Sequence, residues 1–168
     1  DANTWISWGY EFGKAEASTL QDLAEHSLVH VIVADLTITE IAKRFAKLEF
    51  DKVEPLTRMD LRTAAKRHLE IELPEIDRDQ LRREIFKQQL DAVAGALNKR
   101  FKVDVRSIDF VKPSAVLEDY THGTGLFGPS AKKDQFPDAF IFAAIAATTS
   151  EDSPLVVLSQ DGDFTDAC

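Results

Sequence analysis

Residues 134–164 constrain the fold of this chain more than any other stretch of the sequence. Pro137 suits the first position of a helix, and a nearly unbroken apolar run, residues 139–147, follows it. A cluster of turn-forming residues then leads to residues 155–158, a short run typical of strands inside a parallel sheet. A buried helix followed by a buried strand predicts an α/β fold.

Acidic residues stand at the two ends of this unit that meet at one edge of the sheet. In an α/β layer the helix runs antiparallel to the strands, so the start of the helix lies beside the end of the strand. Asp138 stands at the start of the helix, and Asp161 and Asp163 follow the strand. Because open α/β sheets bind their ligands at this edge, we expect the three carboxylates to face a site.

Two further acids are expected at the same edge. Glu40 lies in the first turn of a predicted helix, residues 37–50, which follows a predicted strand, residues 29–34. Asp1, in the motif Asp1-Ala2-Asn3, would join it if a strand runs up to it. Four separate segments would then direct carboxylates into one crevice. Their mutual repulsion raises their pKa values unless a cation neutralises them.

Each acid also has a purely structural interpretation. Residues 37–40 have the pattern of a capping box, Asp138 suits the positive end of a helix, and residues 161–163 suit a turn. Asn3 or Thr4 could cap a helix. Caps have no reason to fall on one edge after several strands, whereas a hard cation needs oxygen ligands from separate segments. The joint pattern therefore favours a metal site.

These residues give the chain a resemblance to the PIN-domain nucleases along essentially its whole length. In that family an Asp in a D-x-N setting ends the first strand, and a Glu begins the helix after the second strand. An Asp begins a later helix, and one or two acids follow the fourth strand in a D-x-D-F setting. The matching residues here are Asp1-Ala2-Asn3, Glu40, Asp138 and Asp161-Gly162-Asp163-Phe164. The run from Lys132 to Asp138 is similar to a bacterial branch with a basic pair before F-P-D.

The resemblance implies a fold and a domain organisation. We expect a three-layer α/β/α Rossmann-like sandwich with a central, mainly parallel sheet and a helical insertion. Residues 1–168 would form one domain, with the first strand upstream of residue 1. Members of the family often pair, so an antitoxin, another protein or a second copy of the chain is an expected partner.

The site implied by the acids and by the resemblance is a nuclease centre. Carboxylates without clustered His or Cys select Mg²⁺ or Mn²⁺, which activate water for phosphodiester hydrolysis. By resemblance the substrate is RNA rather than DNA, cut internally to leave a 5′ phosphate. The expected metal ligands are Asp1, Asp138 and Asp161, with Glu40 as ligand or water-orienting base, Asp163 as accessory ligand, Asn3 as hydrogen-bonding organiser, and Lys132 and Lys133 on a substrate phosphate.

The middle of the chain predicts a helical arm, residues 57–101, outside the sheet. Two helices, residues 57–70 and 77–101, are separated at Leu73-Pro74. Their basic residues form either a solvated face or a groove for a nucleic-acid backbone. Lys43, Arg44 and Lys47 precede the arm and are assigned to solvated faces of their helix.

An aromatic stripe near the start of the chain has two interpretations. Trp5, Trp8 and Phe12 are spaced for one face of a helix, which is typical of a core. Alternatively, Trp8 or Tyr10 could stack on a nucleic-acid base near Asp1.

Bulk properties exclude some classes of protein. A net charge of −9 over 168 residues argues against a polyanion binder that relies on a basic surface, although it is compatible with a metal-dependent nuclease. The single cysteine, Cys168, excludes an intramolecular disulfide and fits a reducing compartment, so we expect a cytoplasmic protein. No run reaches the length of a transmembrane helix, and no membrane association is expected.

Three other functions stay open at this point. A catalytically inactive PIN-like domain could bind nucleic acid or act as a scaffold. A Rossmann-like phosphatase would need a second acid two residues after its nucleophilic Asp, and Asp1-Ala2-Asn3 lacks one. A small-molecule or nucleotide-binding module would need a glycine-rich turn directly after a strand, which is also missing.

Overall fold

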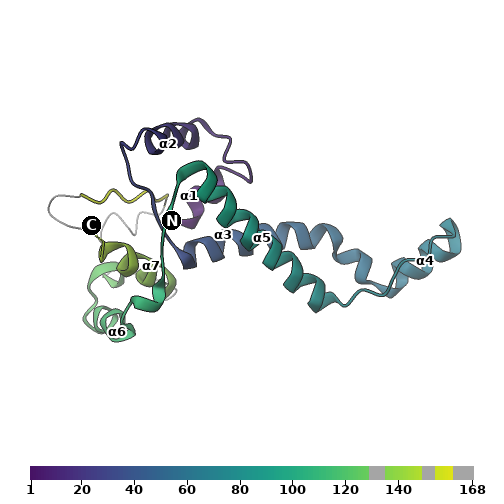
Figure 1. Ribbon diagram of the computed structural model, residues 1–168. Coiled ribbons are helices and arrows are strands. Elements are labelled where there is room, and N and C mark those ends of the chain that lie inside the picture. Colours follow the sequence, from purple (N-terminus) through teal and green to yellow (C-terminus); the bar gives the residue numbers. More distant parts are fainter. Residues whose placement is uncertain (129–134, 149–153, 161–168) are drawn as a thin grey trace.

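The computed structural model describes residues 1–128, 135–148 and 154–160, and Figure 1 shows the course of the chain. Helices make up most of these residues. None of the helices among them has the length and apolar character needed to cross a membrane. The principal elements are α1 (Ala2–Ser7), α2 (Ala15–Glu25), β1 (Ile32–Ala34), α3 (Asp35–Val53), α4 (Met59–Leu69), α5 (Arg78–Phe101), β2 (Asp104–Arg106), α6 (Pro113–His122) and α7 (Phe136–Ala146).

The described residues form one small parallel sheet. β1 pairs with β2 so that Ile32 lies opposite Asp104 and Val33 opposite Val105. Parallel strands need a long crossover, and α3, α4 and α5 supply it. Two parallel strands joined through helices agree with the predicted α/β class. The central sheet of a three-layer sandwich needs more strands than these, so that finer architecture stays a prediction.

Residues 154–160 form no strand, so the strand predicted at residues 155–158 is wrong for this structure. A strand forms where a neighbouring strand supplies hydrogen-bond partners. In the described residues, the Leu158 carbonyl instead accepts a hydrogen bond from the Asp1 nitrogen at 3.2 Å. The segment therefore lies beside Asp1.

The predicted capping box at residues 37–40 is also wrong, because α3 begins earlier, at Asp35. The Asp35 carboxylate accepts hydrogen bonds from the Ser107 hydroxyl at 2.7 Å and from the Ile108 N–H at 3.1 Å. These bonds join the start of α3 to the chain that leaves β2. The partners are more than 70 residues apart in the sequence, so no local pattern indicates them.

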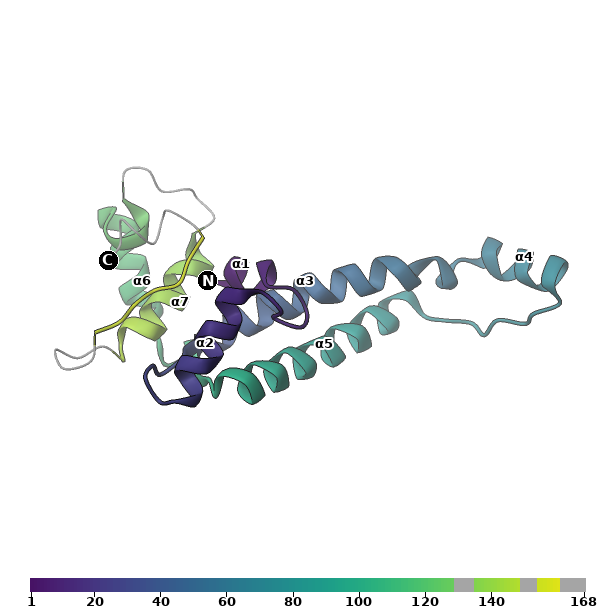
Figure 2. The same cartoon turned by 90° about the horizontal axis from the view of Figure 1, so that it is seen from above.

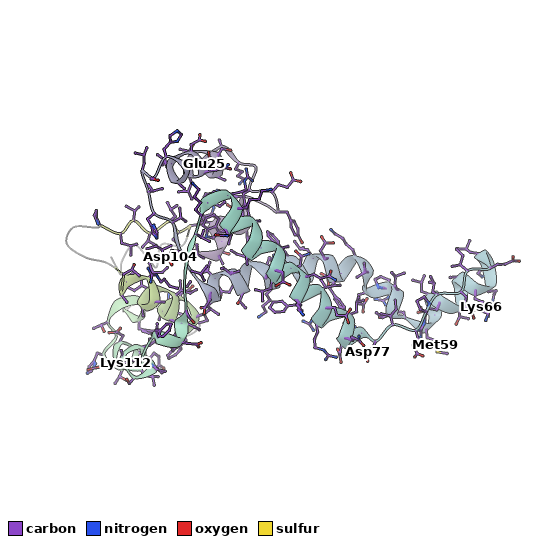
Figure 3. All side chains as sticks on the ribbon, in the orientation of Figure 1. Glu25, Met59, Lys66, Asp77, Asp104 and Lys112 are labelled. Atoms are coloured by element: carbon purple, nitrogen blue, oxygen red, sulfur yellow. The ribbon has the colours of Figure 1, made fainter. Side chains whose placement is uncertain are left out.

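α3, α4 and α5 form a helical arm that protrudes from the rest of the molecule (Figures 1 and 2). α3 and α5 pack along one another, and α4 lies at the far end, where Figure 3 labels Met59 and Lys66. Asp77 caps α5 by accepting a hydrogen bond from the Gln80 N–H at 2.8 Å. α4 buries none of its residues. The arm therefore depends on the contact between α3 and α5 for its support.

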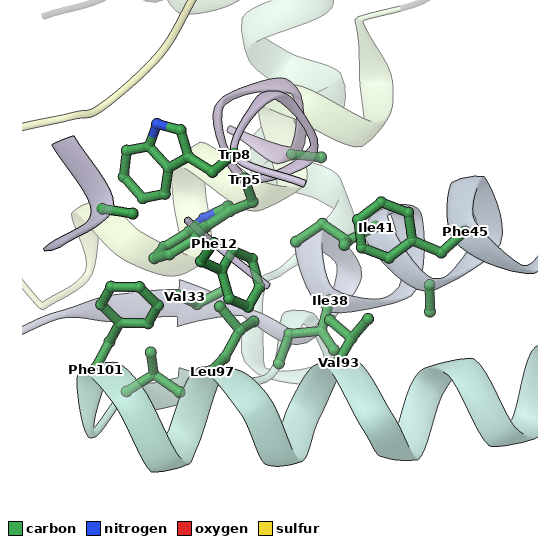
Figure 4. Close-up of a cluster of buried hydrophobic side chains, with 14 residues drawn as sticks. Trp5, Trp8, Phe12, Val33, Ile38, Ile41, Phe45, Val93, Leu97 and Phe101 are labelled. Atoms are coloured by element: carbon green, nitrogen blue, oxygen red, sulfur yellow. The ribbon is translucent and has the colours of Figure 1, made fainter. Parts of the chain in front are cut away.

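The main core lies where α1, α3 and α5 meet (Figure 4). Trp5 makes edge-to-face contacts with Phe12 and Phe101, with ring centroids 5.8 and 5.1 Å apart. Trp8 is only 9% exposed, so it belongs to the core and is not available to a base. Tyr10 stacks on Phe45 with ring centroids 3.9 Å apart. The aromatic stripe thus fastens α1 to the body of the protein.

A second apolar cluster supports α7. Ala139 on α7 is buried with Val116 of α6 and with Leu126 and Phe127, which follow α6. Phe136, in the first turn of α7, packs against Phe127 at a centroid distance of 5.0 Å. This packing fixes the first turn of α7, and that turn carries Asp138.

Candidate active site

Three of the predicted acids line one pocket of about 430 Å³ between α1, α3 and α7. Asp1 precedes α1, Glu40 lies on α3, and Asp138 lies in the first turn of α7. The structure therefore brings together carboxylates from three segments that are far apart in the sequence. The complete lining is Asp1, Ala2, Asn3, Ile6, Glu40, Lys43, Arg44, Lys47 and Asp138.

The carboxylate of Asp1 is held by hydrogen bonds on both oxygens. Oδ1 accepts from the Asn3 N–H at 3.0 Å, which makes Asp1 the N-cap of α1. Oδ2 accepts from the Ser159 hydroxyl at 3.0 Å and from the Gln160 N–H at 3.4 Å. Asp1 can therefore cap α1 and line the pocket at the same time. The groups that donate hydrogen bonds to its carboxylate also fix the orientation of that carboxylate at the pocket.

Asn3 lies between two hollows of the surface. It lines the acidic pocket and also a neighbouring pocket of about 430 Å³, whose other lining residues are Ile6, Ser7 and Gln160. The Gln160 amide donates to the Ser7 hydroxyl at 2.9 Å. The exposed Asn3 side chain is therefore placed at the rim between the acids and a second, polar hollow.

The electrostatics of the pocket reflect the crowding of acids. Burial is the main cause that raises the pKa of the half-buried Glu40 carboxyl, and the negative charge of Asp138 raises it further. Lys43 and the Asp1 ammonium act in the opposite direction, but they do not cancel the shift. A cation bound between these carboxylates would relieve their repulsion.

Glu40→Gln is expected to raise the melting temperature of the metal-free protein at neutral pH. The raised folded-state pKa means that Glu40 is harder to ionise in the folded protein than in the unfolded chain. The resulting penalty is absent below the unfolded pKa of about 4.3, grows as the pH rises through the folded pKa, and is complete above it. Thermal unfolding at about pH 7.5 and about pH 4 should therefore show a gain that disappears in acid. A lower melting temperature for the variant at neutral pH would contradict this.

The donor set in the pocket suits a hard cation, since it consists of carboxylates without a neighbouring His or Cys. Within residues 1–128, 135–148 and 154–160, however, no group of three or more His, Cys, Asp or Glu side chains is arranged to hold a metal ion. Asp161 and Asp163 lie outside the described residues, as do Lys132 and Lys133. The three acids therefore supply the chemistry of a metal site without its closed geometry.

Lys43, Arg44 and Lys47 are solvated, as predicted, but the structure also places them at the acidic pocket. All three are exposed, but they line the pocket that contains the acids. The signal was present in the sequence, because they follow Glu40 at i+3, i+4 and i+7, which is one face of a helix. Cations and carboxylates thus share the same surface of α3.

Asp35 is a second residue that the sequence reasoning missed. It directly follows β1, the position expected for a site acid, but it does not line the acidic pocket. Its hydrogen bonds to Ser107 and Ile108 give it a structural role instead. Position after a strand is therefore not sufficient to identify a site carboxylate.

Comparison with known proteins gives one family. The model of the PIN domain matches residues 1–164, which include the expected acids from Asp1 to Asp163. No curated protein and no solved structure matches the chain significantly. The match covers nearly the whole sequence and agrees with the resemblance carried by the acidic motifs. This chain therefore belongs to the PIN-domain family, whose domains have nuclease-type functions.

Proposed function

We propose that this protein is a nuclease that hydrolyses phosphodiester bonds with the help of Mg²⁺ or Mn²⁺ and that prefers RNA to DNA. The main support is the meeting of Asp1, Glu40 and Asp138, from three separate segments, at one pocket. An all-carboxylate set favours these two ions over softer metals. The preference for RNA and for internal cleavage comes from the family resemblance.

Each acid has a role in the proposed reaction. Asp1 and Asp138 would hold the ion, together with Asp161 and Asp163. When bound, a divalent ion lowers the pKa of a coordinated water and stabilises the charge that develops on the phosphoryl oxygen. Glu40, which lines the same pocket, would orient the attacking water by accepting a hydrogen bond from it.

A catalytically inactive binding module is the second candidate function. One observation favours it: the described residues contain no closed group of metal ligands. In that case the acids would act only as caps and as elements of the surface, as Asp1 does for α1. The phosphatase alternative gains no comparable support, because Asn3 stands where its second acid is required.

We expect the protein to cut single-stranded RNA in the presence of Mg²⁺ or Mn²⁺ and to be inactive in chelator. The full chain, with any native flanking residues, is incubated with end-labelled RNA and DNA of the same sequence. Internal products with 5′ phosphates should appear with RNA, and DNA should be cut more slowly. The reason for the metal dependence is that carboxylates alone cannot stabilise a developing negative charge.

Calorimetric titration with Mn²⁺ is the companion measurement. Binding of metal without cleavage would point to a different substrate. Absence of both would leave the acids as structural residues and favour the inactive binding module.

A further inference from the structure

We infer that Lys43, Arg44 and Lys47 form a track on α3 that binds the phosphates of a single nucleic-acid strand next to the acidic pocket. The inference deepens the proposed function, since it says how the strand approaches the carboxylates. In a chain with a net charge of −9, binding of a polyanion must come from a local cluster of cations rather than from the overall charge.

The three cations form no close contact with an acid among the described residues, although the charge of Lys43 acts on Glu40. Lys43, Arg44 and Lys47 make no hydrogen bond or ion pair within residues 1–128, 135–148 and 154–160. The cations farther along the arm behave differently: Lys52 pairs with Glu49, and Arg58 and Arg78 pair with Glu54, at 2.7 to 3.3 Å. Three exposed cations without an ion pair thus lie together at the pocket, whereas Lys52, Arg58 and Arg78 are each paired with an acid.

The track has a direction and an end. With a rise of about 1.5 Å per residue, Lys47 lies roughly 10 Å along α3 from Glu40, toward the arm. One turn farther, the same helix face carries Asp51, an exposed acid that would repel a phosphate. The favourable surface therefore extends over two or three phosphates only.

The pocket is large enough to admit part of a single strand. A volume of about 430 Å³ suits a group of nucleotide size, and the carboxylates lie inside it. A single strand can bend to bring one phosphate to these carboxylates, whereas the phosphates of a duplex are held in fixed positions. Flexible lysine side chains contact phosphates as point charges, so the track should bind strands regardless of sequence.

The salt dependence of binding tests the track without any cleavage. A fluorescent single-stranded RNA of about 12 nucleotides is titrated with the full chain in chelator, from about 50 to 300 mM salt. Each phosphate contact on a single strand contributes about 0.7 to the slope of log K against log salt concentration. Lys43→Gln, Arg44→Gln and Lys47→Gln combined should therefore lower the slope by about 2, and Lys47→Gln alone by about 0.7.

A matched control removes the same charge elsewhere. Arg83, Lys87 and Lys99 on α5 are exposed and do not line the pocket. Their combined replacement by glutamine should leave the slope unchanged, and Lys47→Arg should retain the wild-type slope. Equal losses in both triple variants would mean general electrostatic attraction and would overturn the track. Absence of RNA binding by the wild-type protein would also overturn it and would favour an acidic protein as the partner of these cations.

The binding result and the cleavage result can be separated. If the triple variant lowers the salt slope of RNA binding as expected but the wild-type protein cleaves no RNA, the phosphate-binding track is supported and the proposed nuclease function is rejected. If the wild-type protein cleaves RNA and the triple variant keeps the wild-type salt slope of RNA binding, the nuclease function is supported and the track is rejected.

Discussion

Asp138→Asn is expected to lower the rate of RNA cleavage by at least about a hundredfold while leaving the protein folded. The substitution keeps the size of the side chain but removes one of the charges that would hold the ion. Stabilisation of the developing charge by a bound ion contributes several kcal/mol, and about 2.7 kcal/mol corresponds to a hundredfold change in rate. The measurement is the cleavage rate in saturating Mg²⁺ or Mn²⁺ under single-turnover conditions.

The stability of the same variant separates a functional from a structural carboxylate. Asp138 raises the pKa of Glu40 by repulsion, so its neutralisation should leave the metal-free melting temperature unchanged or slightly higher. Asp91→Asn is the matched control, since Asp91 is exposed on α5 and lies outside the pocket. It should keep full activity. A variant at Asp138 that cleaves RNA normally would sink the nuclease proposal for this site.

The sequence predicted those elements that local patterns determine. The apolar run at residues 139–147 indicated α7, and the Asp77 capping signal indicated the start of α5. Both depend on residues within a few positions of one another. Trp5, Trp8 and Phe12 were expected in the core, which the structure confirms, but α1 ends at Ser7, so Trp8 and Phe12 do not lie on the predicted helix face.

The errors have a common physical cause, which is dependence on distant partners. The start of α3 is set by hydrogen bonds from Asp35 to residues beyond β2, and no local signal reports them. The β-branched run at residues 155–158 has strand propensity but pairs with no strand in the described residues. Propensity is therefore overridden wherever hydrogen-bond partners decide the conformation.

Part of the candidate site could be predicted from the sequence. The expected position of acids at one edge of the sheet selected Asp1, Glu40 and Asp138, which line one pocket. The same criterion gave no reason to prefer them over Asp35. The cations of α3 were assigned to solvated faces, and their position beside Glu40 was not used. Their spacing from Glu40 becomes informative only once one face of the helix is known to border the pocket.

Phe101→Ala is expected to destabilise the protein by about 3–5 kcal/mol, the range for loss of a buried Phe side chain. Phe101 is 1% exposed and contacts Trp5, Trp8 and Phe12, with ring centroids 5.1 to 6.4 Å apart. Such a loss is a large part of a typical total stability of about 5–15 kcal/mol. It corresponds to a fall in melting temperature of roughly 6–20 °C for a protein of this size.

Phe110→Ala is the matched control, because Phe110 is 90% exposed and its removal leaves no cavity. It should change stability by less than about 0.5 kcal/mol. Phe101 is also linked to the candidate site. Trp5 packs on Phe101 and belongs to α1, the helix that Asp1 caps. A cavity at Phe101 should loosen α1 and weaken Mn²⁺ binding even below the melting temperature. Unchanged Mn²⁺ affinity in the folded variant would show that the position of Asp1 does not depend on the aromatic core, but on its hydrogen bonds to Ser159 and Gln160.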